Sequence, residues 1–188
     1  MKIAVNFIET IGEEPVTVDE VKLYCHVDNS DEDELFPVMI KAARQYAEHR
    51  TGRQLVLSVF DIVVTEYTES EREKGFELPV IPCSSLVSVE VDGVEVLDNS
   101  LFLYTPSAVG REPVFASFKT LDGFPNGDQM VLRVQAGQCT EAEKQWMMVR
   151  INNWYEQRAT FGIGPNFHEF HHDFVDALLD TTTYYGAF

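Results

Sequence analysis

Positive charge is scarce in this chain. It contains 14 Lys and Arg residues against 31 Asp and Glu residues, so its formal net charge is -17. Proteins that hold nucleic acid tightly neutralise phosphates with Lys and Arg, so the composition excludes a typical DNA-gripping protein. Two interpretations remain. The surplus acid either maintains solubility or lines a passage through which DNA slides without binding.

Cysteine and long apolar segments are also scarce. Cys25, Cys83 and Cys139 are odd in number, widely spaced and without a C-x-x-C pair, which argues against both a disulfide framework and a cysteine-rich zinc site. A reducing cytoplasm fits this usage best. No apolar stretch reaches the roughly 18 residues that span a bilayer, and the amino terminus lacks the layout of a signal peptide. We therefore expect a soluble protein without a membrane partner.

Sequence motifs for catalysis are nearly absent. The chain has no G-x-S-x-G motif and no P-loop. Residues 168–172, HEFHH, match the H-E-x-x-H signature of zinc peptidases, with His168 and His172 on one helical face and Glu169 beside them. Only aspartates follow as candidates for a third ligand, so the favoured interpretation is a solvated polar helix face. A zinc-dependent hydrolase through these residues stays a distant alternative, and we predict no catalytic, cofactor-binding or metal-binding residue.

Two helices are predicted near the amino terminus. Thr17 and Glu20 form a capping-box pattern that opens a short helix through about Cys25. A second helix is predicted from Ser30 or Asp31 to a glycine C-cap at Gly52. Its apolar positions form one continuous arc that we expect to be buried, namely Leu35, Phe36, Met39, Ile40, Ala42, Ala43, Tyr46 and Ala47.

Two residues of this second helix stand out from the pattern. Arg50 projects into the apolar arc, so it must extend outward to solvent or the helix end, or form an ion pair within the fold or with a neighbouring chain. Pro37 lies too far inside the predicted helix for an ideal first-turn proline. Either a kink or a later helix start would accommodate it.

From Gln54 the hydrophobic period changes from 3.6 to 2. The runs up to residue 137 predict five to seven antiparallel strands in a sheet or small sandwich. Asp92-Gly93 lies between two alternating runs and predicts a type I′ hairpin. Residues 66–75 are strongly polar and are interpreted as a loop.

A third helix is predicted from a second capping box at Thr140 and Glu143 to about Arg158. It is apolar on two sides, which predicts two surfaces to bury, one of them against the sheet or another subunit. One side carries Met147, Met148, Ile151, Trp154 and Tyr155, the other Ala142, Trp146 and Val149, with Glu143, Arg150 and Gln157 between them. A last helix from about 167 to 179 precedes an aromatic tail.

These segments predict an α+β protein, a small bundle of about four helices that carries an inserted antiparallel β-sheet or small sandwich. Residues 1–53 are assigned to an amino-terminal helical part and residues 54–137 to the β insertion. Residues 138–188 are assigned to carboxyl-terminal helices and a tail that complete the bundle.

Three segments resemble the head-tail connector (adaptor) proteins of tailed bacteriophages and prophages. They are EPVTVDEVKLYCHVDNSDEDELFPVMIKAARQYAEHRTGRQL at 14–55, the helix WMMVRINNWYEQRAT, and the closing FVDALLD. The resemblance implies a non-enzymatic virion protein without a cofactor, made in the host cytoplasm and placed in the neck. It implies a dodecameric ring beneath the portal that extends the DNA channel, lets packaged DNA pass without specific binding, and docks head-closure or tail proteins.

The resemblance and the apolar pattern together select candidate contact residues. Subunit or portal contacts are expected at Arg50, Trp146, Val149, Trp154 and Tyr155, and in the tail at Tyr184, Tyr185 and Phe188. The tail is interpreted either as an anchor in a groove of the portal or a neighbouring subunit, or as a frayed end. The alternative function is another neck or completion protein, a stopper or tail terminator, which would build its ring from the sheet.

Overall fold

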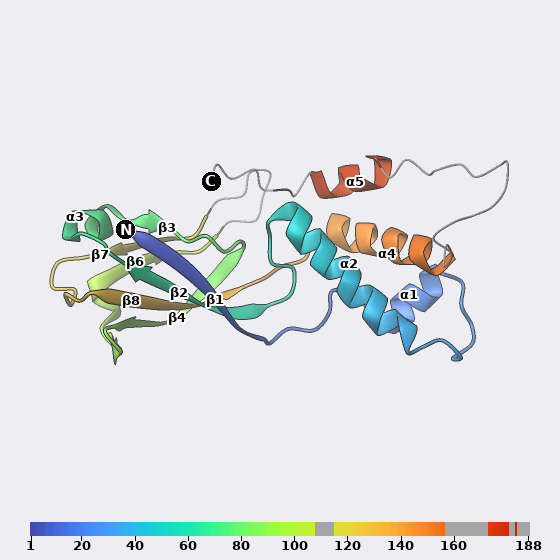
Figure 1. The fold of residues 1–188 in the computed structure, drawn as a ribbon, viewed down its shortest axis with the longest axis horizontal. Helices are drawn as coiled ribbons and strands as arrows, with labels where there is room; N and C mark the ends of the chain where they lie inside the picture. The colour runs from blue at the N-terminus through green and yellow to red at the C-terminus, as the bar shows by residue number, and fades with distance from the viewer. Residues whose placement is uncertain (108–114, 157–172, 181–182, 184–188) are drawn as a thin grey trace. The chain divides into compact units, whose positions relative to one another are not determined.

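The computed structural model describes residues 1–107, 115–156, 173–180 and 183, and its chain forms two compact units (Figure 1). A sheet unit comprises residues 1–13 and 53–138, and a helical unit comprises residues 14–52 and 139–188. Helices and antiparallel sheets occur together, which confirms the predicted α+β class. No helix within the described ranges is long and apolar enough to cross a bilayer.

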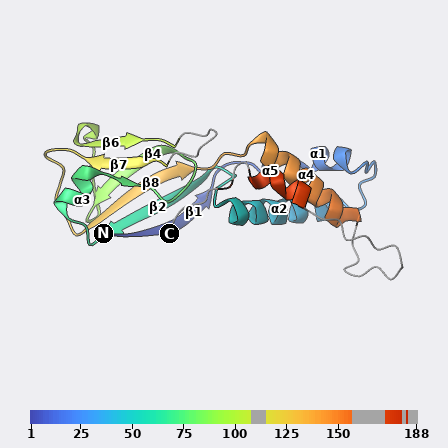
Figure 2. The ribbon, with the colours of Figure 1, turned by 90° about the horizontal axis from the view of Figure 1, so that it is seen from above.

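The sheet unit contains two antiparallel sheets. The five-stranded sheet has the order β1 (Lys2–Thr10), β2 (Ser58–Thr65), β8 (Gln129–Ala136), β4 (Cys83–Val91) and β5 (Val94–Glu95). The three-stranded sheet has the order β3 (Phe76–Glu77), β7 (Ser117–Thr120) and β6 (Phe102–Thr105), and the short 3-10 helix η1 (Asn99–Leu101) precedes β6. Figure 2 shows β6 and β7 on the side of this unit away from β1.

The hydrophobic core of the sheet unit follows the period of two along its strands. From Phe60 onward in β2 and from Met130 onward in β8, residues alternate between buried and half-buried, and Ile62 and Leu132 are fully buried in one cluster. Phe118 of β7 is also fully buried, and its ring lies 5.4 to 6.3 Å from the rings of Phe76, Phe102 and Phe124. This aromatic cluster fixes the three-stranded sheet to the core.

The predicted hairpin is confirmed at the turn between β4 and β5. Val91 pairs with Val94, and both turn residues have positive φ, 48° at Asp92 and 78° at Gly93, as a type I′ turn requires. The Asp92 carboxylate also accepts hydrogen bonds from the backbone N–H groups of Asp128 (3.1 Å) and Gln129 (2.9 Å). These bonds tie the turn to the start of β8.

The first residues of the chain differ from the prediction. Residues 1–53 were assigned to the helical part, whereas Lys2–Thr10 form β1 and pair antiparallel with β2 from Lys2↔Thr65 to Thr10↔Ser58. The local pattern explains the difference. Ile3, Val5 and Phe7 alternate with smaller or polar residues, which is the period of a strand.

The polar segment 66–75 also differs from the prediction of a loop. It contains a short helix, α3 (Glu69–Lys74), opened by a capping box in which the Thr68 hydroxyl accepts from the Glu71 N–H and the Glu71 carboxylate accepts from the Thr68 N–H. The T-x-x-E pattern that marks such a start is present in the sequence. The segment was nevertheless interpreted as a loop because nearly all of its residues are polar.

The helical unit contains α1 (Val18–Tyr24), α2 (Leu35–Thr51), α4 (Glu141–Glu156) and α5 (Asp173–Asp180). The capping boxes predicted at Thr17 and Thr140 are both formed, with the Glu20 and Glu143 carboxylates each 2.7 Å from the threonine backbone nitrogen. Helix α4 packs against α1, α2 and α5. Its two apolar sides therefore have partners within the same unit.

Helix α2 begins later than Ser30 or Asp31, at Leu35, which settles the position of Pro37. As the third residue of the helix, Pro37 lacks an N–H group that would have no intrahelical acceptor there. The helix ends as predicted at Gly52, with φ 67°.

The buried face of α2 is narrower than the predicted arc. Phe36, Ile40, Ala43 and Ala47 are buried, whereas Leu35, Ala42 and Tyr46 are exposed. Sequence reasoning had also missed that Arg44 is buried. Its guanidinium is 2.8 Å from Glu14 and from Glu48. Burial alone would lower the pKa of Arg44, but these two carboxylates outweigh it and raise the pKa.

Candidate interaction surfaces

Trp146, a predicted contact residue, lies in the interior of the helical unit. Its side chain is fully buried, and its indole N–H donates to Asp176 Oδ1 at 3.0 Å. Its ring stacks on Tyr46 of α2, with a centroid distance of 5.4 Å and an interplanar angle of 12°. Trp146 thus connects α4 to both α2 and α5 and presents no surface of its own.

Arg150 joins the same aromatic cluster. Its guanidinium carbon lies 5.4 Å from the Tyr46 ring centroid, 5.7 Å from that of Trp146 and 5.8 Å from that of Trp154. A guanidinium at such distances is attracted to the negative faces of aromatic rings. The polar position that sequence analysis placed between two apolar sides therefore carries a cation–π contact, and Arg150 is a structural residue that the analysis missed.

Arg50 forms ion pairs within the fold. Its guanidinium lies 3.2 Å from Asp176 and 3.6 Å from Asp180, both on α5. Desolvation would lower the pKa of Arg50, but Asp176 first, with Tyr46 and Asp180, more than offsets that effect and raises it. Of the alternatives considered for Arg50, the structure contains the ion pair inside the fold.

Tyr155 faces α2 and the segment before it. Its hydroxyl donates to Glu32 at 2.7 Å, and its ring stacks on Phe36 at 5.3 Å. Val149 and Trp154 are half-buried. The side chains of Trp146, Tyr155 and Arg50 are thus occupied by contacts within the helical unit, and their predicted contact with a partner stays a prediction.

The remaining predicted residues lie outside the described residues. They are Tyr184, Tyr185 and Phe188 of the tail, and His168, Glu169 and His172 of the HEFHH segment. Within the ranges that the structure does describe, no group of three or more His, Cys, Asp or Glu side chains is placed to hold a metal ion.

A hollow of about 650 Å³ opens on the helical unit where α1 meets α4. Its apolar lining comes from Leu23, Tyr24 and Met148, and Glu20 and Glu156 supply acidic groups. The side chain of Leu23 is 79% exposed, unusually high for a leucine. Sequence analysis missed this surface, because α1 is too short for its apolar period to show which side is free.

A second exposed apolar surface runs along α2. Leu35 and Val38 lie one turn apart on the helix and are exposed, Val38 by 69%, and Lys41 follows one turn later. Sequence analysis had placed Leu35 in the buried arc. We call Leu35, Val38 and Lys41 the α2 stripe.

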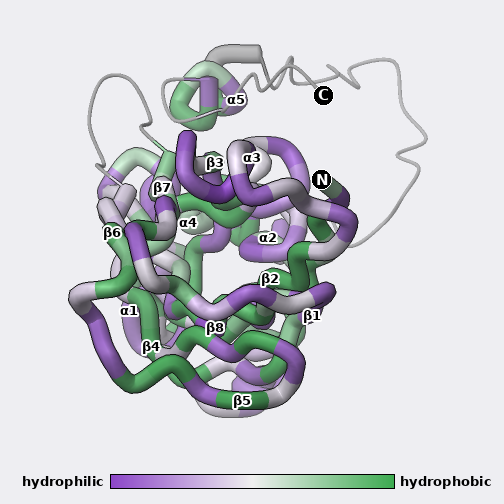
Figure 3. Tube along the Cα trace, turned by 90° about the vertical axis from the view of Figure 1, so that its left-hand side faces the viewer, coloured by the Kyte–Doolittle hydropathy of each residue, from purple (hydrophilic) through white to green (hydrophobic). Residues whose placement is uncertain are grey.

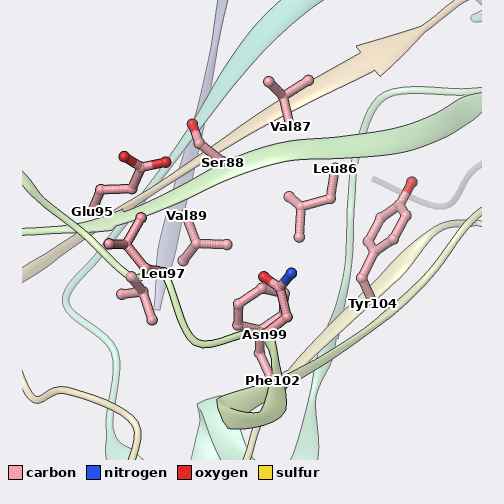
Figure 4. A pocket seen from close by; sticks show the side chains of 10 residues that line it. Leu86, Val87, Ser88, Val89, Glu95, Leu97, Asn99, Phe102 and Tyr104 are labelled. Carbon is pink, nitrogen blue, oxygen red and sulfur yellow. The ribbon is translucent and has the colours of Figure 1, made fainter.

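The sheet unit has a groove of about 410 Å³ between β4 and the segment that leads into β6 (Figure 4). Leu86 and Val89 of β4 face Leu97, Phe102 and Tyr104 across it. The Tyr104 hydroxyl donates to the Cys83 carbonyl oxygen at 3.2 Å, and burial raises the pKa of Tyr104. The hydrogen-bonded, neutral side chain of Tyr104 therefore closes the groove at the end near Cys83.

The outer strand β1 forms a third apolar surface. Ile3, Val5 and Phe7 pair with the buried β2 residues Val64, Ile62 and Phe60, so they lie on the core-facing side of the sheet. They are nevertheless 36%, 42% and 58% exposed. Figure 3 shows the reason, because β1 is at the margin of the sheet away from β6 and β7, which cover the core. We call these three residues the edge stripe.

Comparison with known families gives a match that covers α1, α2, α3 and the strands β2 to β4. Residues 15–92 match the family described as "Phage gp6-like head-tail connector protein". This match confirms the resemblance inferred from the sequence. No curated protein sequence matches the chain significantly.

Solved structures match over nearly the whole chain. A chain from the "Virion of native gene transfer agent (GTA) particle" has a TM-score of 0.70 at 16% identity, and one from the "Neck of empty GTA particle computed with C6 symmetry" has 0.68 at 16%. A chain from the "Neck of native GTA particle computed with C12 symmetry" has 0.62 at 15%. Each match covers 98% of this chain and 97% of the other. At such low identity the likeness establishes the fold.

Proposed function

We propose, from the match of residues 15–92 to the phage gp6-like head-tail connector family, that the protein forms a ring of identical copies in the neck of a phage-like particle. The family is one of structural connectors, and the match agrees with the non-enzymatic function predicted from the sequence. The observation that carries the proposal is this family match together with a whole-chain fold shared with proteins of GTA particles and their necks. The C6 and C12 symmetries of those necks support a cyclic arrangement.

A cyclic ring needs two different surfaces on each copy, one for each neighbour. The helical unit offers such a pair in the hollow between α1 and α4 and the α2 stripe. The hollow combines the apolar Leu23 with the carboxylates of Glu20 and Glu156, whereas the stripe combines Val38 with Lys41. Apolar surface and opposite charge therefore match across the contact. We assign the ring contact to these two surfaces.

Paired variants test this contact. Leu23→Glu disrupts the hollow and Val38→Glu disrupts the stripe, and both positions are exposed, so neither change buries a charge in the isolated chain. Each variant alone should form no rings, whereas mixing the two in equal amounts should produce more association than either variant shows alone, because each variant keeps one working surface. Leu103→Glu, at an exposed position of the sheet unit, is the matched control. Rings formed by either single variant would contradict the assignment.

The partner above the ring is proposed to be the portal, and packaged DNA is proposed to pass through the ring. Acidic residues outnumber basic ones in both units, which supports passage without retention because phosphates are repelled by such a wall. Electrophoresis with duplex DNA at low salt should show no shift. A retained complex would exclude this role for the charge.

Electron microscopy of the protein mixed with purified portal rings tests the proposed function. Rings seated on the portal are expected for the wild-type chain and for Leu103→Glu, and not for Leu23→Glu. A chain that stays unbound beside its portal would contradict the proposal. The same images separate a connector from a stopper or tail terminator, because they show whether the helices or the sheet contact the portal.

Two further variants address the chain end. Removal of residues 181–188 should weaken co-sedimentation with portal rings if the aromatic tail is an anchor, and unchanged binding would leave it a frayed end. Alanine at His168 and His172 should leave portal association unchanged. If the wild type bound a stoichiometric zinc ion and had a hydrolytic activity, and the alanine variant lost both, the metal-enzyme alternative would be favoured instead.

A further inference from the structure

Strand β1 leaves an open edge on the sheet. Its only strand partner within the described ranges is β2, so its other edge has no ladder there. All nine residues of Lys2–Thr10 are exposed. Natural sheets protect such an edge with Pro, with charges in the middle of the strand, or by covering it. β1 has no Pro, and its charges, Lys2 and Glu9, stand near its two ends.

The order of side chains along β1 is self-complementary. In an antiparallel pair of two β1 strands centred on Val5, Ile3 lies opposite Phe7 of the second copy and Val5 lies opposite Val5. All three belong to the edge stripe, on one side of the sheet. The two stripes would therefore join into one continuous apolar surface.

The charges agree with the same arrangement. Lys2 pairs with Thr65 of β2 and Glu9 with Val59, so both lie on the side of the sheet opposite the edge stripe. Ile8 is an extra residue at a β-bulge, because Phe7 and Glu9 pair with the consecutive residues Phe60 and Val59. With Ile8 left out of the ladder, two-fold antiparallel pairing centred on Val5 brings each Lys2 next to Glu9 of the other copy, while the uncharged centre of the strand meets itself. The Lys2 ammonium already lies 2.6 Å from the Glu66 carboxylate of its own chain. Both side chains are exposed, so the ammonium has room to form a second ion pair with Glu9 of the other copy.

We propose that, before assembly, two copies of this chain associate through their β1 strands into a two-fold dimer with a continuous sheet. The contact uses the same surface on both copies and is complete with two. It cannot join neighbours of a cyclic ring, so it belongs to the unassembled protein and is released when the neck forms. It protects the open edge from indiscriminate strand pairing. The inference goes beyond the proposed function and concerns a different surface from the ring contact.

Sedimentation velocity across a concentration series, on the full chain without portal, tests the dimer. The wild type should show a monomer–dimer equilibrium. Val5→Glu places two like charges together at the centre and should weaken the dimer by about tenfold or more. Val5→Thr keeps a β-branched residue there and should change the affinity by less than about threefold. Far-UV circular dichroism confirms that both variants are folded.

Charge reversal identifies the orientation of the strands. Lys2→Glu or Glu9→Lys alone should weaken dimerisation several-fold, and the double variant should recover most of the wild-type affinity, because opposite charges again meet at both ends. A strictly monomeric wild type, an unaffected Val5→Glu dimer, or a double variant without recovery would overturn the proposal.

Assembly on the portal is a separate readout. Val5→Glu should still form portal-bound rings, since the ring contact is assigned to the helical unit. If Val5→Glu failed to form portal-bound rings, the inference would be overturned, and the open edge of β1 would instead be a contact surface for a partner in the neck. Absence of rings in the wild type would instead count against the proposed function alone.

Discussion

Replacing Trp146 with Phe should destabilise the helical unit by about 3 kcal/mol. The indole N–H donates to the Asp176 carboxylate at 3.0 Å, and a hydrogen bond to a charged group contributes about 1.5–3 kcal/mol. Phe also buries less apolar surface than Trp, by roughly 40 Å², which adds about 1 kcal/mol. Asp176 keeps its contact with Arg50, 3.2 Å away, so its charge is not left alone.

Tryptophan fluorescence during urea unfolding measures this loss selectively. The chain has two Trp residues, both in the helical unit, so Trp154 still reports on that unit in the Trp146→Phe variant. Trp154→Phe, at a half-buried position, is the matched control and should cost less than about 1 kcal/mol. Portal association of folded Trp146→Phe should be unchanged. A cost below about 0.5 kcal/mol together with lost portal binding would refute the view that Trp146 is structural.

Three further changes give separate outcomes. Phe118→Ala should destabilise the sheet unit by about 3–5 kcal/mol, measured by circular dichroism during unfolding, because it removes the ring at the centre of the aromatic cluster. Asp92→Ala should cost about 1–3 kcal/mol in the same assay, since two backbone N–H groups lose their acceptor and a positive φ of 48° disfavours alanine. The pKa of Glu20 is lowered by hydrogen bonds from the backbone and then the hydroxyl of Thr17, so this cap stabilises α1 above the ordinary pKa of 4.5 and is lost as the pH falls through the lower folded value. Glu20→Gln should flatten that part of the pH–stability curve, and an unchanged curve would show that the cap contributes nothing.

Local signals in the sequence predicted much of the fold. The capping boxes at Thr17 and Thr140, the C-cap at Gly52 and the Asp92-Gly93 turn each depend on two to four neighbouring residues, and each formed as expected. Among the described residues between 54 and 137, the number of strands also lies within the predicted five to seven, because alternation is strong there. Where side chains and backbone interact over a few residues, the sequence is sufficient.

Features that depend on distant parts of the chain were not predictable in this way. The alternation of Ile3, Val5 and Phe7 indicates a strand, but it does not show that β2, almost sixty residues later, is its partner. The pattern of α4 likewise could not show that α1, α2 and α5 pack around Trp146 and Tyr155, whose predicted contact with a partner stays a prediction. The hollow beside Leu23 and the edge stripe are what remains uncovered after packing. Periodicity alone does not contain that information.

The sheet unit interrupts the helical unit between Gly52 and Cys139, and its two ends are tied together. The Gln138 N–H donates to the Gln54 carbonyl oxygen at 3.1 Å, and an Arg53 guanidinium N–H donates to the Gln138 carbonyl oxygen at 3.3 Å. The segments that follow α2 and precede α4 are therefore held close together, independently of the strands inserted between them. Evolution could lengthen, shorten or replace the inserted strands while the ends of α2 and α4 keep their spacing, so connectors of very different size could retain one helical framework.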